Sequence, residues 1–424
     1  MEKHWVKNFD ELATTPNRKM ALEIMEAGLD AINTEKIVEF SVSVVGNILF
    51  IKGKPFNLVK YNKIKVIGFG KSSPEAALAL EKILGPRINE GVVIGLHKVE
   101  TKYIEIFTGT HPRPSEANIE ASKKIYEMIK DSNEEDLIIV LVSGGGSALL
   151  CYPESEVNEG AKLYDSFLKS GKTISEMNTI RKHFSLLKGG GLTKLAYPAT
   201  VIGLIFSDVP GDIFEDVASG PTYKDKTTIT DAQKIITENN LEKFDLVETP
   251  KEDKYFDSVY NFVLVSNKTA AKAMAQKAQE FNLEANIIST DLYEGIDKAL
   301  EKIFISKKNN SVVLAAGESR IVIGKNGGKG GRNLHMGLEV IKQKLLDENS
   351  VFISFASDGM DNSDAAGAVV DKNTIEKIEK LGINVKDSLE HFDSYPVFEK
   401  SGDIIFTGPT GANVSDLIML LTKK

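Results

Sequence analysis

The sequence has little cysteine and no long apolar run. Of its 424 residues only Cys151 is a cysteine, so a disulfide within the chain and a zinc cluster built on cysteines are both excluded. No uncharged apolar run reaches about 18 residues, and residues 1–20 lack the apolar core of a signal peptide. We therefore expect a cytoplasmic protein with no membrane partner.

The chain also lacks a basic excess. It carries 52 Lys and Arg against 60 Asp and Glu, a formal net charge of -8, whereas nucleic-acid-binding domains usually present a positive surface. We therefore expect no nucleic-acid partner. An anionic substrate would need a local positive site made of lysine, arginine and backbone N–H groups.

Three well-known motifs are absent. The stretch 408–413 has no Gly-Lys-Ser/Thr and is not a P-loop. The loop 68–73 lacks the third glycine of a dinucleotide fingerprint, and the next strand ends without an acidic residue for a ribose, which disfavours NAD. Ser147 lacks the second glycine of a hydrolase elbow, so we do not expect a nucleophile there.

What the sequence does contain is the pattern of an α/β protein. The length exceeds the roughly 250–300 residues over which one core grows, so we expect two lobes, with a polar boundary between Tyr223 and Phe256. Residues 18–50 show helical periodicity. From Lys63 onward, apolar runs that end in glycine alternate with helical patterns, as in a mostly parallel sheet. The runs are IKVIGFG (64–70), GVVIGLH (91–97), LIIVLVSGGG (137–146), TVIGLIFSD (200–208), VVLAAGES (312–319), VFISFASDG (351–359) and DIIFTGPTG (403–411), with NFVLVSN from Asn261 opening the second lobe.

Two glycine loops follow strands in the first lobe. In VLVSGGGSALL (140–150), glycines let successive N–H groups converge at a helix N-terminus. The ligand expected at such N–H groups is an anion, a phosphate or a carboxylate. A tight strand-to-helix turn is the alternative. GKSS (70–73) adds Lys71 where a phosphate would sit, and a solvated loop cation is the alternative for this residue.

A third loop, at 324–333, holds five glycines, two lysines and Arg332. A flexible linker is the alternative, but linkers rarely lead straight into an amphipathic helix such as NLHMGLEVIKQKLL. We therefore predict an active-site loop in which Arg332 offers a planar fork to a carboxylate or a phosphoryl group.

Carboxylates follow three strands, at Asp208, Glu318 and Asp358. Phosphoryl transfer needs an oxygen-bound cation, cationic side chains and a carboxylate that orients the attacking hydroxyl, and the loops contain all three classes. Helix caps and Asx turns are the alternative, above all for Asp212, Asp361 and Asp364. For His111, in a proline-rich loop, we expect neutral hydrogen bonding or packing in preference to metal binding.

Taken together, the motifs resemble the glycerate 2-kinase family, in order and spacing, over nearly the whole chain. They are GKSS (70–73), THPRPSEAN (110–118), VSGGGSALL (142–150), SDVPGDIFEDVASGPT (207–222), GESRIVIGKNGGKGGRN (317–333), SDGMDNSDAAGAVVD (357–371) and GPTGANVSDL (408–417). The resemblance implies a larger Rossmann-like α/β domain, placed at residues 1–245, and a smaller α/β domain with a mixed sheet at residues 246–424, whose chain end could return to the first. It also implies ATP- and Mg2+-dependent phosphorylation of D-glycerate to 2-phosphoglycerate in the cleft between them.

The resemblance gives catalytic roles to Lys71 and Arg332, and we add Asp208 as the group that orients or deprotonates the 2-hydroxyl. Asp358 is the candidate Mg2+ ligand. Two positions depart from the family, because Leu334-His335 stands where Gln-Glu is usual and the aspartate-rich loop is one residue shorter. The predicted substrate- and nucleotide-binding residues are Gly70, Ser72, His111, Ser143, Gly144, Gly145, Gly146, Ser147, Glu318, Gly330 and Asn413.

Two other functions stay open at this point. A nicotinamide-dependent hydroxypyruvate reductase would consume NADH with hydroxypyruvate, and a non-catalytic small-anion-binding protein would bind a ligand without ATP turnover. The sequence does not fix the hydroxyl that is phosphorylated, the anion held by the glycine loop or the number of subunits, for which a homodimer is one assembly we consider.

Overall fold

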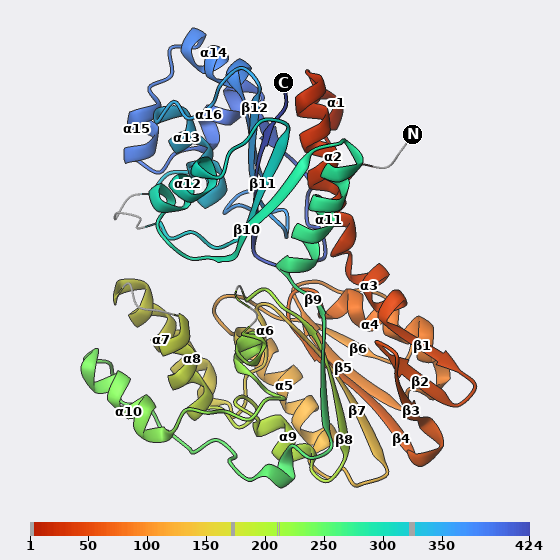
Figure 1. The fold of residues 1–424 in the computed structure, drawn as a ribbon. Helices are drawn as coiled ribbons and strands as arrows, with labels where there is room; N and C mark the ends of the chain where they lie inside the picture. The colour runs from red at the N-terminus through yellow and green to blue at the C-terminus, as the bar shows by residue number, and fades with distance from the viewer. Residues whose placement is uncertain (1–3, 171–173, 210, 212, 322–326) are drawn as a thin grey trace. The chain divides into compact units, whose positions relative to one another are not determined.

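The computed structural model describes residues 4–170, 174–209, 211, 213–321 and 327–424. The chain forms two compact units. We call Thr34–Leu264 the continuous unit, and Met1–Asn33 with Val265–Lys424 the discontinuous unit. Each is an α/β fold built on a six-stranded sheet (Figure 1), so the predicted fold class is confirmed.

The sheet of the continuous unit has the order β6-β5-β4-β7-β8-β9. β4 pairs in parallel with β5 and β7, and the β5–β6 and β7–β8 pairs are parallel too. Counted from β4, the order reads 3-2-1-4-5-6, which is that of a doubly wound Rossmann sheet. The strands are β4 (Lys63–Phe69), β5 (Glu90–Gly95), β6 (Glu105–Thr108), β7 (Asp136–Ser143), β8 (Thr200–Phe206) and β9 (Val259–Val265).

Helices cover both faces of this sheet, and its central strands are mostly apolar. Every residue of β7 is buried, as expected of a strand between two helical layers. α4 (Ser73–Leu84) packs on β4, β5 and β7, α5 (Glu116–Ile129) on β5 and β6, and α9 (Gly191–Ala196) on β8. A separate helical group with its own small core comprises α7 (Ser155–Ser170), α8 (Ile174–His183) and α10 (Ile229–Glu238).

The predicted helix over residues 18–50 is wrong in its last part. α2 (Pro16–Ala31) and α3 (Thr34–Ser41) are helical, but an antiparallel sheet of β1 (Val42–Val45), β2 (Ile48–Ile51) and β3 (Lys54–Asn57) follows. The β-branched residues of β1 favour a strand. Gly46, with a φ of 59°, makes the tight turn into β2.

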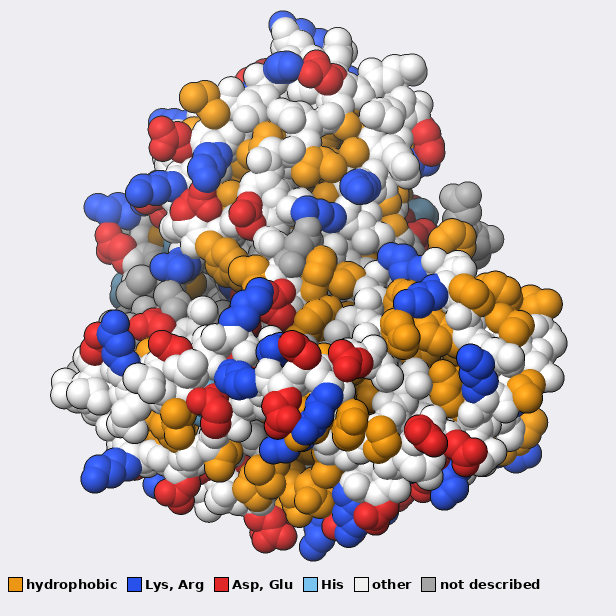
Figure 2. Space-filling view, turned by 60° about the horizontal axis from the view of Figure 1, so that its bottom comes forward, with side chains coloured by type: hydrophobic (Ala, Val, Ile, Leu, Met, Phe, Trp, Pro, Cys, Tyr) orange, Lys and Arg blue, Asp and Glu red, His pale blue; other side chains and the backbone are white. Residues whose placement is uncertain are grey.

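The small sheet and the helical segments just before and after it carry large apolar side chains that solvent reaches. Phe40 is 92% exposed, Val45 67% and Val59 69%. Figure 2 shows hydrophobic side chains gathered toward the right of the continuous unit, while lysines, arginines and acidic side chains are interspersed over the rest of the face in view.

The sheet of the discontinuous unit is mixed, with the order β10-β11-β15-β12-β13-β14. β10 and β11 are parallel, whereas β15 is antiparallel to both of its neighbours, β11 and β12. Asp416, the first residue of β15, therefore lies opposite Gly317 and Ala356, the last residues of those neighbours. The strands are β10 (Glu284–Leu292), β11 (Ser311–Gly317), β12 (Ser350–Ala356), β13 (Gly367–Val370), β14 (Ile404–Ile405) and β15 (Asp416–Thr422).

Helices also flank the mixed sheet (Figure 1). α2 and α11 (Asn267–Glu280) lie side by side against one face, and α12 (Ile296–Ile305) and α13 (Arg332–Lys342) against the other. The shorter helices are α1 (Phe9–Leu12), α14 (Lys372–Lys380), α15 (Val385–Glu390) and α16 (Tyr395–Ser401). No helix in the described part of the chain is both long and apolar enough to cross a membrane.

The predicted domain boundary between residues 245 and 246 stays a prediction. The two compact units divide the chain at other positions. They divide it after Leu264, and they place the first 33 residues with the C-terminal ones. A buried ionic contact accounts for the second difference, because Arg18 of α2 donates from Nε to Asp371 (2.7 Å) and its Nη1 forms an ion pair with Asp403 Oδ1 at 2.8 Å. No pattern in the sequence of α2 indicates that the partners of Arg18 lie so far along the chain.

Candidate active site

Two glycine loops meet at the switch point of the continuous unit. β4 and β7 are neighbours, and the chain leaves them toward opposite edges of the sheet. Sheets of this kind bind ligands at such a point, beyond the carboxyl ends of the strands. Gly70–Ser72 follow β4 and Gly144–Ser147 follow β7, so the fold brings the two predicted loops side by side.

Backbone contacts lock these loops together. The N–H of Lys71 donates to the carbonyl of Gly144 (2.8 Å), and the N–H of Ser72 donates to Oγ of Ser143 (3.1 Å). Gly70 has a φ of 132°, and a Cβ there would lie 2.1 Å from Ser143 Oγ. Only glycine fits, and the lysine that follows it has a fixed backbone position.

Side chains from other loops fill the space beside the next two glycines. A Cβ on Gly144 would lie 2.0 Å from Asp208 Oδ2. A Cβ on Gly145, whose φ is 80°, would lie 3.3 Å from Lys71 Cγ and 3.2 Å from His111 Cδ2. The glycine loop thus gathers Lys71, His111 and Asp208 from three segments of the chain.

The glycine loop ends in α6 (Gly146–Leu149), a single turn whose first N–H groups have no acceptor within the helix. Ser147 Oγ lies 2.8 Å from Ser219 Oγ, and Ser219 donates to Asn178 Oδ1 (3.1 Å). Ser147 therefore belongs to a chain of side-chain hydrogen bonds that reaches α8. An anion at the N–H groups of this loop stays a prediction.

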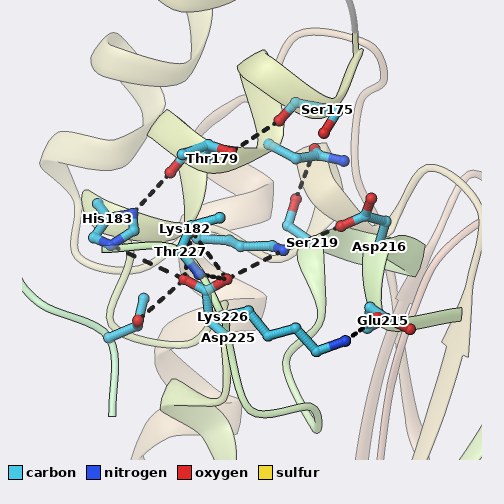
Figure 3. Close-up of polar contacts among 12 residues, drawn as sticks. Ser175, Thr179, Lys182, His183, Glu215, Asp216, Ser219, Asp225, Lys226 and Thr227 are labelled. Atoms are coloured by element: carbon cyan, nitrogen blue, oxygen red, sulfur yellow. Dashed lines mark hydrogen bonds and ion pairs between the residues drawn. The ribbon is translucent and has the colours of Figure 1, made fainter. Parts of the chain in front are cut away.

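An ionic cluster supports the segment that follows Asp208 (Figure 3). Lys182 of α8 contacts Asp216 of the 3-10 helix η4 (Phe214–Ser219) at 3.1 Å and Asp225 at 3.5 Å. Burial acts to raise the pKa of Asp225, but Lys182 and the hydroxyl of Thr227 hold that pKa below its usual value. No local pattern predicts this cluster, because Asp216 and Asp225 lie 34 and 43 positions beyond Lys182 in the sequence.

In the discontinuous unit, acidic residues meet at one edge of the sheet. Glu318 follows β11, Asp358 lies two residues beyond β12, and Asp416 begins β15 between them. Because β15 runs in the opposite direction, its beginning adjoins the ends of its neighbours. Asp416 was not among the predicted site residues.

Two of these carboxylates hold Arg332. Its Nη1 donates to Glu318 Oε2 (3.0 Å), and its Nε lies 3.1 Å from Asp416 Oδ2. Burial opposes the positive charge, but Asp416 and Glu318 raise the pKa of Arg332 above its usual value, so the fork stays cationic. Burial also raises the pKa of Asp416 well above its usual range, although Arg332 opposes this shift.

Asp361 fixes the start of α13 and thereby the place of Arg332. Its carboxylate accepts the N–H groups of Asn333 (3.1 Å) and Leu334 (2.8 Å). The Asn333 side chain donates to both Asp361 (3.1 Å) and Asp416 (2.9 Å). Asp361 is therefore a helix cap, one of the two interpretations that its sequence allowed, and burial raises its pKa.

The remaining predicted residues of this unit lie in neighbouring loops. Asp358 Oδ1 accepts the N–H of Met360 (3.1 Å), and Asn413 Oδ1 accepts the N–H of Ser415 (3.2 Å). Gly330 has a φ of 121°, and a Cβ there would lie 2.4 Å from Ser394 Oγ. Gly324, Lys325 and Asn326 of the third glycine loop lie outside the described residues, as does Asp212.

The residues at this edge fit a magnesium ion that a nucleotide shares. Mg2+ commonly takes one or two carboxylates together with substrate phosphates and water. Among the residues described, no three or more His, Cys, Asp or Glu side chains are placed to hold a metal by themselves. Glu318 and Asp416 are engaged with Arg332, which makes the half-buried Asp358 the carboxylate best suited to such a shared ion.

Comparison with known proteins gives two family matches. Residues 20–252 match the "Domain of unknown function (DUF4147)" and residues 311–416 the "MOFRL family". The chain is 35% identical to a glycerate 2-kinase of Pyrococcus horikoshii over 95% of this chain and 97% of that protein. It is 31% identical to a D-glycerate 2-kinase of Thermotoga maritima, over 95% and 97%. The crystal structure of a Thermotoga maritima glycerate kinase superposes with a TM-score of 0.82 at 30% identity, covering 95% of this chain and 99% of that one.

These relatives and the shared fold establish the class of protein first. The chain is an enzyme, a kinase built of two α/β units. More narrowly, it belongs to the glycerate 2-kinase family, which confirms the resemblance carried by its ordered motifs.

Proposed function

We propose that this kinase transfers the γ-phosphoryl group of ATP to the 2-hydroxyl of D-glycerate, in a Mg2+-dependent reaction that yields 2-phosphoglycerate. The observation that carries the proposal is the convergence of Lys71, His111 and Asp208 on Gly144 and Gly145 at the switch point. A cation and a carboxylate on one glycine loop are what transfer to an alcohol requires. The names of the relatives supply the substrate.

In this proposal the glycine loop binds and orients the acceptor. The N–H groups of Gly144–Ser147 hold an anion, either the glycerate carboxylate or a phosphate. Asp208 accepts the proton of the 2-hydroxyl or orients it, and Lys71 neutralises charge on the moving phosphoryl group. Ser72 and His111 contribute hydrogen bonds.

Arg332 also neutralises charge on the moving phosphoryl group. Its guanidinium is held in one place by Glu318 and Asp416, so little orientational freedom is lost when it binds an anion. Asp358 holds Mg2+, which when bound neutralises charge on the ATP phosphates.

The test is incubation of the purified chain with ATP, Mg2+ and D-glycerate, followed by 31P NMR of the products. We expect ADP and 2-phosphoglycerate in equal amounts, and no product when Mg2+ is chelated. Formation of 3-phosphoglycerate would refute the assigned hydroxyl while keeping the kinase. Oxidation of NADH with hydroxypyruvate, without ADP formation from ATP, would establish the reductase alternative instead.

Subunit number and location are separate questions. A homodimer and a cytoplasmic location stay predictions, which sedimentation and cell fractionation can test.

A further inference from the structure

A cavity of about 260 Å3 opens within the discontinuous unit, beside α11 and the edge strand β10. None of the residues predicted as site residues lines it. Its lining combines two cations, two hydroxyl side chains and two branched apolar side chains: Lys268, Lys272, Ser289, Thr290, Ile287 and Ile288. This volume is below the roughly 300–1,000 Å3 of small-molecule sites, so it suits a part of a ligand that continues beyond the cavity.

Irregular pairing of β10 shapes the cavity. Ile287 pairs with Leu314 and Ser289 with Ala315, so β10 has one residue more than β11 between these points, and a second irregularity follows before Leu292. A bulge interrupts the alternation of side chains, which lets consecutive residues of β10 reach the same cavity. Asn267 Nδ2 donates to the carbonyl of Thr290 (2.9 Å) and ties α11 to this stretch.

The charge of the lining calls for an anion. Lys268 and Lys272 lie one turn apart on α11, and like charges at this spacing destabilise a helix. Both lie in the first half of the helix, whose positive dipole end disfavours cations, and no acidic residue occurs in its first turn. Two cationic side chains that line one cavity favour an anionic ligand such as a phosphate.

The cavity is connected to the residues that hold Arg332. Asn267 also donates to Ser415 Oγ (3.2 Å), and Ser415 precedes Asp416. Leu292 at the end of β10 pairs with Gly317, which in turn lies opposite Asp416. The cavity and Arg332 are therefore at the same edge of the mixed sheet.

We infer that this cavity binds the nucleotide part of the phosphoryl donor. The α- and β-phosphates of ATP lie between Lys268 and Lys272, and the nucleoside packs on Ile287, whose side chain is 37% exposed. This inference rests on the proposed function, because it takes ATP as the donor. According to this inference the discontinuous unit binds the donor. Arg332 lies nearby, where β11 ends and β15 begins.

The test is equilibrium binding of ADP and of inorganic pyrophosphate to the full chain by titration calorimetry. Lys272→Glu should raise the Kd of both probes by about tenfold or more, because a charge-assisted contact is replaced by a repulsion. Ile287→Asn should raise the Kd of ADP and leave that of pyrophosphate unchanged. Lys277→Glu is the matched control, because it makes the same charge change on the same helix, where Lys277 pairs with Glu280 (2.8 Å).

A Kd for ADP in Lys272→Glu within twofold of the wild-type value, in a variant with an unchanged melting temperature, overturns the inference. Glycerate phosphorylation by the wild type would then still support the proposed function. A wild-type chain that neither binds ADP nor phosphorylates glycerate refutes the proposed function, and the inference fails with it.

Discussion

Asp416 holds Arg332 across a 3.1 Å contact, from the first residue of a strand to the first residue of a helix. The two residues lie 84 positions apart in the sequence, yet β15 and α13 bring them together beside Glu318. Only the arginine of this pair was expected from the sequence. The carboxylate of Asp416 restricts the guanidinium of Arg332 to one orientation.

Asp416→Asn should lower kcat by about 10- to 100-fold, because a small misplacement of a catalytic cation is costly. The KM for glycerate should change little, because Asp416 positions Arg332 and does not touch the acceptor. Steady-state kinetics provide the measurement. Asp364→Asn, at an exposed carboxylate in the loop between β12 and β13, is the control, and equal losses in both variants would contradict the role of Asp416.

The raised pKa of Asp416 predicts opposite effects of pH on activity and stability. As pH falls through this raised pKa, the carboxyl is protonated, Arg332 loses a partner and kcat decreases. The folded state then binds more protons than the unfolded state, so the contribution of Asp416 to stability increases as pH falls and is lost as pH rises through that pKa. In Asp416→Asn the acid limb of kcat and this part of the stability profile should both disappear. A wild-type acid limb that persists in the variant would assign it to another group.

Lys71→Ala and Arg332→Ala should each reduce kcat by about 100- to 1,000-fold, the scale found for groups that stabilise charge in a transition state. Lys71→Ala should lower the free energy of unfolding by no more than about 1 kcal/mol, since this side chain is partly exposed and fills no core. Arg332→Ala should lower it more, by up to about 3–5 kcal/mol, because it leaves the buried carboxylate of Asp416 without its cation. Denaturant unfolding and initial rates would be measured on the same preparations. Lys98→Ala, at an exposed loop lysine, is the control, and wild-type turnover in either site variant would refute the assignment.

Gly144→Ala should inactivate the enzyme by displacing Asp208, because the new Cβ would lie 2.0 Å from Oδ2 of that carboxylate. We expect at least about a tenfold loss of kcat, on the same grounds of misplaced catalytic groups. Gly160→Ala is the matched control, since its nearest neighbour would be Pro114 Cγ at 3.7 Å and alanine favours the helix. Comparable rates in the two variants would show that the position of Asp208 is unimportant.

Arg18→Met should destabilise the discontinuous unit by about 3–5 kcal/mol, because it leaves the buried carboxylate of Asp371 without its cation and Asp403 with only the more exposed Lys377. Lys19→Met, at the next residue of α2, should change stability by less than about 0.5 kcal/mol, since its pairing with Glu23 is exposed. Denaturant unfolding of both variants is the comparison. Burial acts to raise the pKa of Asp371, but Arg18 lowers it overall, so the stability it provides is lost as pH falls through that lowered pKa. The acid sensitivity should be absent from Asp371→Asn.

The sequence predicted those features that local pattern determines. All seven apolar runs quoted above contain strands, because each is a buried β-rich stretch followed by a turn. Asp208 was predicted as a site residue because it directly follows a strand, but its place beside Gly144 joins the ends of two different strands, and no local pattern indicates that contact. Asp416 was missed for a topological reason: its place beside Glu318 depends on the antiparallel direction of β15, which spacing along the chain does not reveal.

The central position of β15 has a consequence for the order in which the protein can mature on the ribosome. Residues 34–264 contain every strand of their own sheet and can close a core while later codons are still being read. The helix of residues 16–31 emerges first, but its apolar face must wait for partners synthesised last. A premature stop just before codon 416 would therefore leave one half of the molecule foldable and split the other sheet between β11 and β12.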